Sequence, residues 1–390
     1  MGGGLRLDAS ALKEAPPNKL SMLERDAPNA PDDLPIAEAP QSMKVVVFGD
    51  SFINVEVFRQ AFQPIAKTEE VRFLSMEEGQ ALTPSTASEK TIREFLGSPG
   101  QLISELKDAD VLVVHGAPVT DEVLTAGKNL KIVCCARGGP VNVDVEAATR
   151  RGIPVVTAPG KNAEAVAELT LALMIMLSRN IIRALDHVRV NRVVSKDNFE
   201  GAEFVGRELD GKTLGLIGYG RVGSRVAKRA LAFGMTVVVY DPFLNKTVLE
   251  ADGASAASLE DVLNSDYVSL HARESKENDN MMGDAQFSQM KRGSYFINTA
   301  RPSMVDEEAL LRAIGSGRLA GAAMDMVKFD PARPVNPLVE NENVIVLPHI
   351  GGATYETTTK GAFIVARQLE RHLRGEKMET VINPQARAGS

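Results

Sequence analysis

The chain has 390 residues, of which 44 are Lys or Arg and 51 are Asp or Glu, so its formal net charge is −7. A protein that binds nucleic acid needs a basic surface for the phosphates, and this balance argues against that class. The longest apolar run, 169–177, is about half of the roughly 20 residues that a membrane-spanning helix needs, which argues against a membrane protein. The length is sufficient for two domains, each with its own core.

Residues 1–42 are rich in Pro, Ala, Asp and Asn and show no sustained periodicity, so we expect an unstructured N-terminal extension. They also lack the charged and then apolar pattern of a signal peptide. The two cysteines, Cys134 and Cys135, are adjacent and cannot build a disulfide framework. We expect them to be buried strand residues of a protein that stays in the reducing cytoplasm.

Short β-branched runs alternate with helical patterns from Met43 onward. Buried parallel strands are predicted at 43–49, 111–114, 132–135 and 155–156, with helices at 101–106 and 145–150 between them. A long helical stretch is predicted from Ala163 to about Val194, and a polar connection with three glycines follows over 195–212. This alternation of strands and helices is typical of an α/β fold.

A second series of the same kind opens at Thr213. Its predicted strands are 213–217, 236–240, 267–270, 295–298, 322–324 and 344–347, with a helix over 222–233. Two successive series predict two α/β domains, Rossmann-like or flavodoxin-like in type. A last helix, 357–374, follows the second series and could return to pack on the first.

The loop Gly218-Tyr219-Gly220-Arg221-Val222-Gly223 lies between a predicted strand and a predicted helix, the context that a dinucleotide-binding loop requires. Gly218 allows the tight turn, Gly220 lets the backbone approach a pyrophosphate, and Gly223 allows close helix–strand packing. The helix N-terminus then offers free N–H groups and the positive end of its dipole to the phosphates.

The next strand ends in Tyr240 and is followed by Asp241-Pro242. A carboxylate at this place accepts hydrogen bonds from the adenosine ribose hydroxyls and repels a 2′-phosphate. We therefore predict NAD as the cofactor, in preference to NADP.

Five histidines are candidates for proton transfer, and His349 has the most favourable setting. It follows the strand VIVL and Pro348, and Gly351 and Gly352 come just after it, where backbone can approach a bound molecule. Such an imidazole can take a hydroxyl proton and return it. His115 and His271 also end apolar strands; His271 is placed to border the cofactor, although a structural role is an equal alternative.

Arg301 ends the run FINTAR, again at the end of a predicted strand. Its planar guanidinium suits bidentate binding of a carboxylate and polarisation of the neighbouring carbonyl group.

Taken in order, these motifs resemble the D-isomer-specific 2-hydroxyacid dehydrogenases, in their phosphoglycerate-dehydrogenase-like branch. The matching stretches, which spread over most of 43–380, are RGGPVNVDVEAATRRGIPVV, PGKNAEAVAELTLALMIML, ELDGKTLGLIGYGRVG, NTAR, GAAMD and LPHIGGAT. The ordered combination is far more specific than any one of them.

The resemblance implies an NAD-binding domain over 160–349, inserted into a substrate-binding domain formed by 43–159 and 350–382. It implies a homodimer built through the cofactor domains and a small 2-hydroxy or 2-keto acid as the substrate. It assigns the substrate carboxylate to Arg301, acid–base catalysis to His349 and the nicotinamide carboxamide to Asp325. Further cofactor contacts are expected from Val166, Thr299, Ala300, Gly351 and Gly352, and substrate contacts from His115, Gly116, Arg137, Gly138 and Gly139. No metal site is predicted.

Three positions depart from the family pattern. Asp330, before Pro331, stands where the family has a Glu that pairs with the catalytic His, so we expect a shorter carboxylate to orient His349. Pro302 follows Arg301 where the family has Gly, and restricts Arg301 to extended conformations. The loop His115-Gly116-Ala117-Pro118 lacks the arginines of phosphoglycerate-specific members, which weakens phosphoglycerate as the substrate. Arg137, Lys161, Arg273 and Lys328 are left as possible anion contacts or as surface charges.

The leading hypothesis is reversible oxidation of a D-2-hydroxy acid with NAD. The altered Asp330 and Pro302 motivate an alternative of another class, a non-catalytic NAD-sensing protein on the same scaffold. A third hypothesis is oxidation of another small acid such as formate, with which the carboxylate of Asp330 fits poorly.

Overall fold

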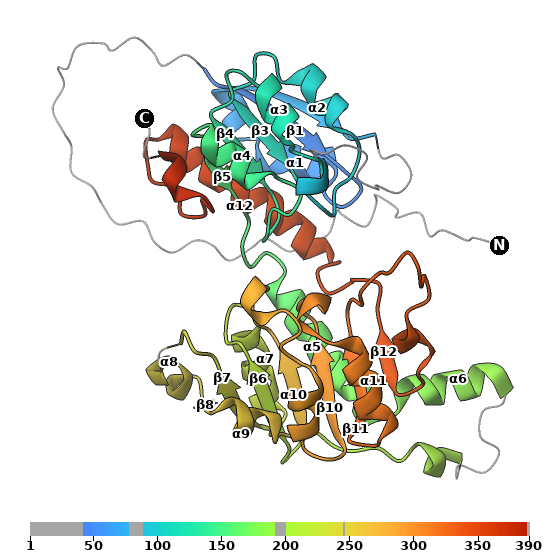
Figure 1. Cartoon of the computed structure of the whole chain (residues 1–390). Coiled ribbons are helices and arrows are strands. Elements are labelled where there is room, and N and C mark those ends of the chain that lie inside the picture. Colours follow the sequence, from blue (N-terminus) through green and yellow to red (C-terminus); the bar gives the residue numbers. More distant parts are fainter. Residues whose placement is uncertain (1–41, 78–88, 192–199, 245, 388–390) are drawn as a thin grey trace. The chain divides into compact units, whose positions relative to one another are not determined.

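The computed structural model describes residues 42–77, 89–191, 200–244 and 246–387 (Figure 1). The predicted extension over 1–42 therefore lies outside the described residues, except for Ser42, and so does the beginning of the predicted connection over 195–212. The rest of the chain carries two parallel sheets, which confirms the predicted α/β class.

The first sheet has five parallel strands in the order β2-β1-β3-β4-β5. They are β1 (Lys44–Gly49), β2 (Glu70–Ser75), β3 (Val111–Val114), β4 (Ile132–Cys135) and β5 (Val155–Val156). The central strands are buried along their whole length because helices cover both faces of the sheet. Strand β2 was not predicted; it forms the edge of the sheet and its residues are only partly buried or exposed, so it lacks the apolar run of the others.

Alternate residues of these strands point into two different cores. On one face, Val46 and Leu112 pack in a cluster with α2 (Pro99–Glu105), α3 (Asp121–Ala126) and α4 (Val145–Arg150). On the other face, Val45 and Val111 pack with α1 (Val55–Ala61) and α12 (Tyr355–Leu373). The last helix, red in Figure 1, thus lies beside the blue and green elements of the first sheet.

The second sheet has seven parallel strands in the order β12-β11-β10-β9-β6-β7-β8. They are β6 (Thr213–Ile217), β7 (Thr236–Tyr240), β8 (Ser255–Ala256), β9 (Tyr267–Leu270), β10 (Ser294–Asn298), β11 (Leu319–Met324) and β12 (Val344–Val346). One core contains residues of α5 (Ala163–Ser178) and α7 (Gly223–Ala232). The other contains residues of α9 (Leu259–Leu263), α10 (Asp284–Gln289) and α11 (Glu307–Gly315), while α8 (Lys246–Ala251) lies beside the edge strand β8.

The prediction of one continuous helix after Ala163 was wrong. Helix α5 ends at Ser178, and a separate helix, α6 (Ile181–Asn191), begins after Asn180. Asn180 has φ +53°, a left-handed conformation that asparagine tolerates and that ends a helix. Its side-chain amide donates to the carbonyl of Val205 at 3.2 Å, which fixes the break.

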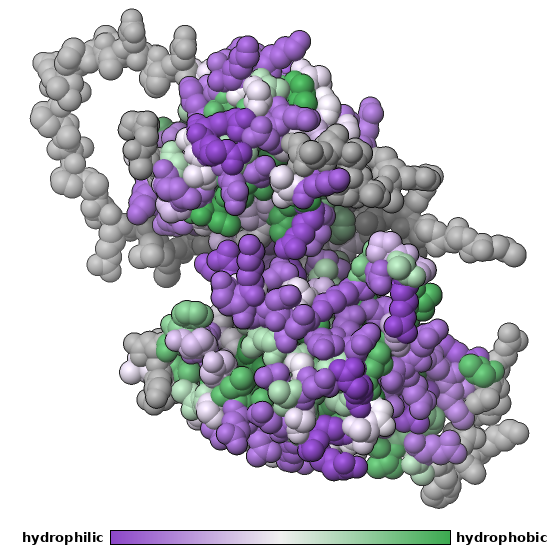
Figure 2. Space-filling model, viewed as in Figure 1, coloured by the Kyte–Doolittle hydropathy of each residue, from purple (hydrophilic) through white to green (hydrophobic). Residues whose placement is uncertain are grey.

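Within the described ranges, no single helix is long and apolar enough to cross a membrane. Only the pair Ala163–Ser178 and Ile181–Val190, bent by 64°, meets the length and composition test together. The face drawn in Figure 2 is mostly hydrophilic, with its hydrophobic side chains in small separate patches. The described residues belong to one compact unit, so the domain boundaries at 159/160 and 349/350 stay predictions.

Candidate functional site

The glycine loop after β6 has the geometry of a phosphate-binding turn. Gly218 has φ +96°, and a side chain there would place its Cβ 2.7 Å from the backbone nitrogen of Ala272. A side chain at Gly223 would clash with the carbonyl of Gly218, so this glycine permits helix α7 to begin against the turn. Gly220 is exposed with open space where a Cβ would be, and backbone there is accessible to a ligand. These residues fit a dinucleotide pyrophosphate.

Asp241 closes this loop from the end of β7. One carboxylate oxygen accepts the N–H of Tyr219 at 2.8 Å and the other accepts the N–H of Phe243 at 2.9 Å. Each oxygen keeps a further lone pair, so the side chain can still accept from a ribose diol. The ring of Tyr219 is buried and its hydroxyl donates to Asp252 at 2.9 Å, so Tyr219 offers a ligand only its backbone. Arg221 lies against Gly160, and Pro242 is exposed.

Three further predicted cofactor residues lie along the same edge. His271 follows β9, and its Nε2 is 2.9 Å from the hydroxyl of Ser269. Burial lowers the pKa of His271 to about 4, so the imidazole is neutral near pH 7. Thr299 is buried after β10 and shares a hydrogen bond of 3.0 Å with Thr170 of α5. Ala300 donates its N–H to Asn298 at 2.9 Å.

The loop that carries His349 is fixed by Asp325, which follows β11 and is buried. The Asp325 carboxylate accepts the N–H groups of Ile350 at 2.9 Å and Gly351 at 3.0 Å, while its carbonyl accepts the His349 N–H at 2.8 Å. Because these bonds hold His349 and the two residues after it, His349 is kept at φ +58°, a conformation that costs free energy for a residue with a Cβ. Val166 of α5 packs behind Gly351.

The His349 ring is exposed at the edge of the sheet, yet its charged form is disfavoured. Partial burial lowers the pKa of His349; Asp325 opposes the shift and the guanidinium of Arg301 reinforces it. The imidazole is therefore neutral near pH 7 and can accept a proton. Glu94 and Arg137, from loops of the first sheet, also act on the His349 charge, so both lie within electrostatic range of this ring.

Asp330 does not meet His349 as the sequence suggested. Its side chain is exposed and accepts the N–H of Ala332 at 2.9 Å, in a turn closed by the backbone bond from Arg333 to Asp330. This local turn uses the carboxylate that we expected to orient the imidazole. The carboxylates that act on the His349 charge are Asp325 and Glu94 instead.

Arg301 has the extended backbone that the following Pro302 requires, with φ −140° and ψ 143°. The Asn298 amide donates to the Arg301 carbonyl at 2.9 Å and fixes the turn after β10. One guanidinium nitrogen donates to the carbonyl of Ala300 at 2.9 Å, and within the described residues no carboxylate pairs with it. The guanidinium thus retains donors for an anionic ligand.

A cavity of about 400 Å³ adjoins Arg301, and its lining includes Arg93, Glu94, Glu274, Ser303 and Lys328. Arg93 forms an ion pair of 2.9 Å with Glu274, which accepts a hydrogen bond of 2.6 Å from Ser303. Lys328 donates to Asn280 at 2.7 Å. Sequence reasoning missed Arg93, Glu94 and Glu274 because they belong to no motif and to none of the predicted elements.

The chain was then compared with known proteins. Residues 171–351 match the sequence profile described as D-isomer specific 2-hydroxyacid dehydrogenase, NAD binding domain. The chain is 36% identical over 284 residues to a glyoxylate reductase of Korarchaeum cryptofilum, and the match covers 72% of this chain and 85% of that one. The chain belongs to the D-isomer-specific 2-hydroxyacid dehydrogenase family.

Other members of this dehydrogenase family are similar too. The D-3-phosphoglycerate dehydrogenase of Methanocaldococcus jannaschii is 40% identical over 299 residues, which are 74% of this chain and 55% of that one. The chain thus spans about half the length of such relatives. Among solved structures, the TT0316 protein of Thermus thermophilus superposes with a TM-score of 0.69 at 31% identity, over 87% of this chain and all of that one. These comparisons confirm the family and the fold that the motifs predicted.

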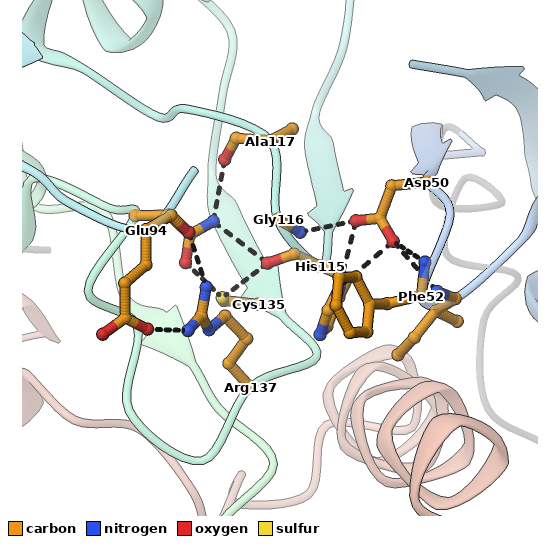
Figure 3. A network of polar contacts seen from close by, with 10 residues as sticks. Asp50, Phe52, Glu94, His115, Gly116, Ala117, Cys135 and Arg137 are labelled. Atoms are coloured by element: carbon orange, nitrogen blue, oxygen red, sulfur yellow. Dashed lines mark hydrogen bonds and ion pairs between the residues drawn. The ribbon is translucent and has the colours of Figure 1, made fainter. Parts of the chain in front are cut away.

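The predicted substrate residues of this family member lie at the carboxyl ends of the first sheet (Figure 3). His115 follows β3 and is buried, and its Nδ1 is 3.0 Å from Asp50, which follows β1. Asp50 also accepts the N–H of Gly116 at 2.7 Å and of Phe52 at 2.9 Å. Burial opposes the charge of Asp50, but the bonds from His115 and the backbone hold its pKa below the usual range.

Arg137 follows β4 and pairs with Glu94. Its guanidinium also donates to the Glu94 carbonyl at 2.7 Å, and Glu94 has a left-handed backbone with φ +53°. Gly138 and Gly139 are exposed beside it. Asp50 and Glu94 carried no motif and were not predicted as site residues, although both fix residues that were.

Proposed function

We propose that the chain catalyses NAD-dependent, reversible oxidation of a D-2-hydroxy acid to the 2-keto acid. One observation carries the proposal: an imidazole of lowered pKa, His349, lies within electrostatic reach of Arg301, which has no carboxylate partner among the described residues. Both follow strands of the sheet that holds the glycine loop. A hydroxyl proton, a carboxylate and a hydride each need a partner, and this edge offers one for each.

In the oxidation, Arg301 binds the substrate carboxylate through two N–H donors and orients the neighbouring hydroxyl group. Neutral His349 takes the hydroxyl proton, and in the reverse direction it returns that proton to the carbonyl oxygen. Bound NAD supplies the acceptor for the hydride that leaves C2. Asp325 keeps His349 in place through the backbone of the same loop.

NAD is the proposed cofactor in preference to NADP because the Asp241 carboxylate would repel a 2′-phosphate. Replacing Asp241 with Ser removes that repulsion and keeps a hydroxyl acceptor for the loop amides. The ratio of kcat/KM with NADP to that with NAD should then rise by about tenfold or more. The variant loses the hydrogen bond from the NAD ribose to the charged carboxylate, and such a bond is worth roughly 1.5–3 kcal/mol. An unchanged ratio would show that Asp241 does not select the cofactor.

The activity is tested by NADH consumption with a panel of short, phosphorylated and sugar-derived 2-keto acids. Chiral chromatography of the product should show only the D-hydroxy acid. If the protein binds NADH and turns over no member of the panel, the proposal is wrong.

That result would favour a second candidate, a non-catalytic protein that senses NAD(H) on the same scaffold. The observation that favours it is Asp330, whose carboxylate is committed to Ala332 rather than to His349. Calorimetry would then show tight NADH binding with no effect of added 2-keto acid.

We also propose a homodimer, formed through the cofactor-binding part of the chain. Helix α6 exposes the apolar side chains of Leu185, Val188 and Val190, the last of them 80% exposed. Light scattering should give twice the chain mass, and Val190→Asp should shift it toward the single-chain mass, whereas Phe243→Asp, also at an exposed apolar residue, should not.

A further inference from the structure

Lys161, a few residues after β5, is a partly buried cation whose ammonium group has no bonding partner among the described residues. Its stem lies against Gly361 of α12, where a side chain would collide with the Lys161 Cδ and the carbonyl of Ala136. Within the described residues the ammonium forms no hydrogen bond and no ion pair. The three N–H donors of this partly buried ammonium are therefore available to an anionic ligand.

The neighbouring carboxylates are already committed. The two oxygens of Asp50 accept hydrogen bonds from His115, Gly116, Phe52 and Ile53. Glu94 is engaged by Arg137. Burial lowers the pKa of Lys161 to about 8, and the charge of Arg137 adds to the shift while Asp50 and Cys135 oppose it. The ammonium is thus charged near pH 7 and is short of an anion.

The position in the fold is one where ligands bind. In a parallel sheet of order β2-β1-β3-β4-β5, the order in which strands are added reverses between β1 and β3, and ligands of open α/β sheets lie outside the carboxyl ends at such a point. Asp50 follows β1, His115 follows β3 and Lys161 follows β5. The adjoining Gly160 and Asn162 lie against Arg221 of the cofactor loop and Gly352 of the His349 loop.

We propose that Lys161 binds a second anionic group of the substrate, at the end opposite the carboxylate that Arg301 holds. This inference rests on the proposed dehydrogenase function and names its substrate class, 2-hydroxy acids that carry a further carboxylate or phosphate. Three other cations of this region already have partners: Arg93 has Glu274, Arg137 has Glu94, and Lys328 has Asn280. Asp50 positions the His115 loop that forms the wall of this subsite.

Two matched substrate pairs test the effect of the second anionic group apart from the rest of the substrate. The first pair is 2-oxoglutarate and its ω-amide, which tests a carboxylate; the second is phosphohydroxypyruvate and hydroxypyruvate, which tests a phosphate. The wild-type protein should prefer the member with the second anionic group in one pair by about 10- to 100-fold in kcat/KM, the range expected for a hydrogen bond to a charged group. Lys161→Gln should abolish this preference through KM and leave kcat on the member without that group within a few-fold.

Two further variants control this result. Lys161→Arg, which keeps the charge, should retain part of the preference. Lys131→Gln makes the same exchange in the same sheet at an exposed lysine that pairs with Asp110, and should leave both substrate pairs unaffected. Thermal denaturation checks folding, and Lys161→Met, which keeps the buried stem, replaces Lys161→Gln if the latter is unfolded.

The outcomes separate the two proposals. If the wild type reduces no 2-keto acid, the dehydrogenase function fails and the subsite fails with it. If the wild type turns over 2-keto acids without preferring the member with the second anionic group in either pair, or if Lys161→Gln and Lys161→Met keep the preference, the function stands and the role of Lys161 is wrong.

Discussion

The carboxyl edges of the two sheets present different kinds of chemical group. The edge of the second sheet is mainly backbone, with Gly218, Gly220 and the amides that Asp241 and Asp325 collect. The edge of the first sheet is made of side-chain pairs between distant parts of the chain: Asp50 and His115 are 65 residues apart, and Glu94 and Arg137 are 43 apart. A site made of backbone groups depends on a short run of consecutive residues and fits one unchanging ligand. A site made of paired side chains can be adapted to another substrate by substituting those side chains.

The largest effect is expected where the two edges meet, at His349. His349→Ala removes the proton acceptor, and kcat should fall by about 10²- to 10⁴-fold, the usual contribution of general acid–base catalysis. NADH affinity, measured by fluorescence titration, should be retained because the glycine loop is untouched. His372→Ala, near the end of α12, is the matched control. A variant that keeps the wild-type kcat would remove His349 from the mechanism.

The stability of the protein at acid pH tests the burial of His271, at the edge of the second sheet. Its folded-state pKa of about 4 is below the unfolded value of about 6.5, so the unfolded state binds more protons between these values. Stability is therefore full above pH 6.5 and is lost as the pH falls toward 4, by up to about 3 kcal/mol from this group. Urea unfolding at pH 7, 5.5 and 4.5 should show a shallower loss for His271→Gln. If the free energy of unfolding falls with pH equally in the wild type and in His271→Gln, His271 is not the cause of the acid sensitivity.

Two glycine variants separate folding from binding at the backbone site. Gly218→Ala forces a Cβ into a left-handed residue beside the backbone of Ala272, and should cost roughly 1–3 kcal/mol of stability. Gly220→Ala has open space, so the melting temperature should stay within about 2 °C, a change of less than 1 kcal/mol. Its NAD affinity should nevertheless fall, because a methyl group then stands where the pyrophosphate approaches. Unaltered affinity would mean that NAD binds elsewhere.

The smallest effect is expected at Asp330, whose exposed side chain bonds only its own turn in the described residues. Asp330→Asn keeps that turn, and both kcat and KM should change by less than about twofold, as for an ordinary surface substitution. A large loss of kcat would show that Asp330 acts on His349 during the proposed reaction, contrary to this structure.

How much of the molecule can be predicted from its sequence follows the same division. The strands that carry the proposed cofactor site were predicted because their β-branched runs, and the glycines near them, are local signals. The break at Asn180 was missed because a single left-handed residue leaves the apolar pattern on both sides intact. Asp50, Arg93 and Glu94 were missed because their importance lies in partners far along the chain. The turn between Asp330 and Ala332 was not predicted, because the family position says nothing of this local hydrogen bond.

The adjacent cysteines of β4 give the first sheet a built-in reporter. Their side chains enter opposite cores, Cys134 beside α12 and Cys135 beside α2 to α4, and both are fully buried. Burial raises the pKa of the Cys135 thiol to about 11 and that of Cys134 further, so neither ionises in the native fold. Because only the thiolate reacts, the labelling rate with a thiol reagent measures how often the core of this sheet opens. The chain has no other cysteine, so opening of the second sheet adds nothing to the labelling signal. The rate at which the core of the first sheet opens can therefore be measured in the intact protein.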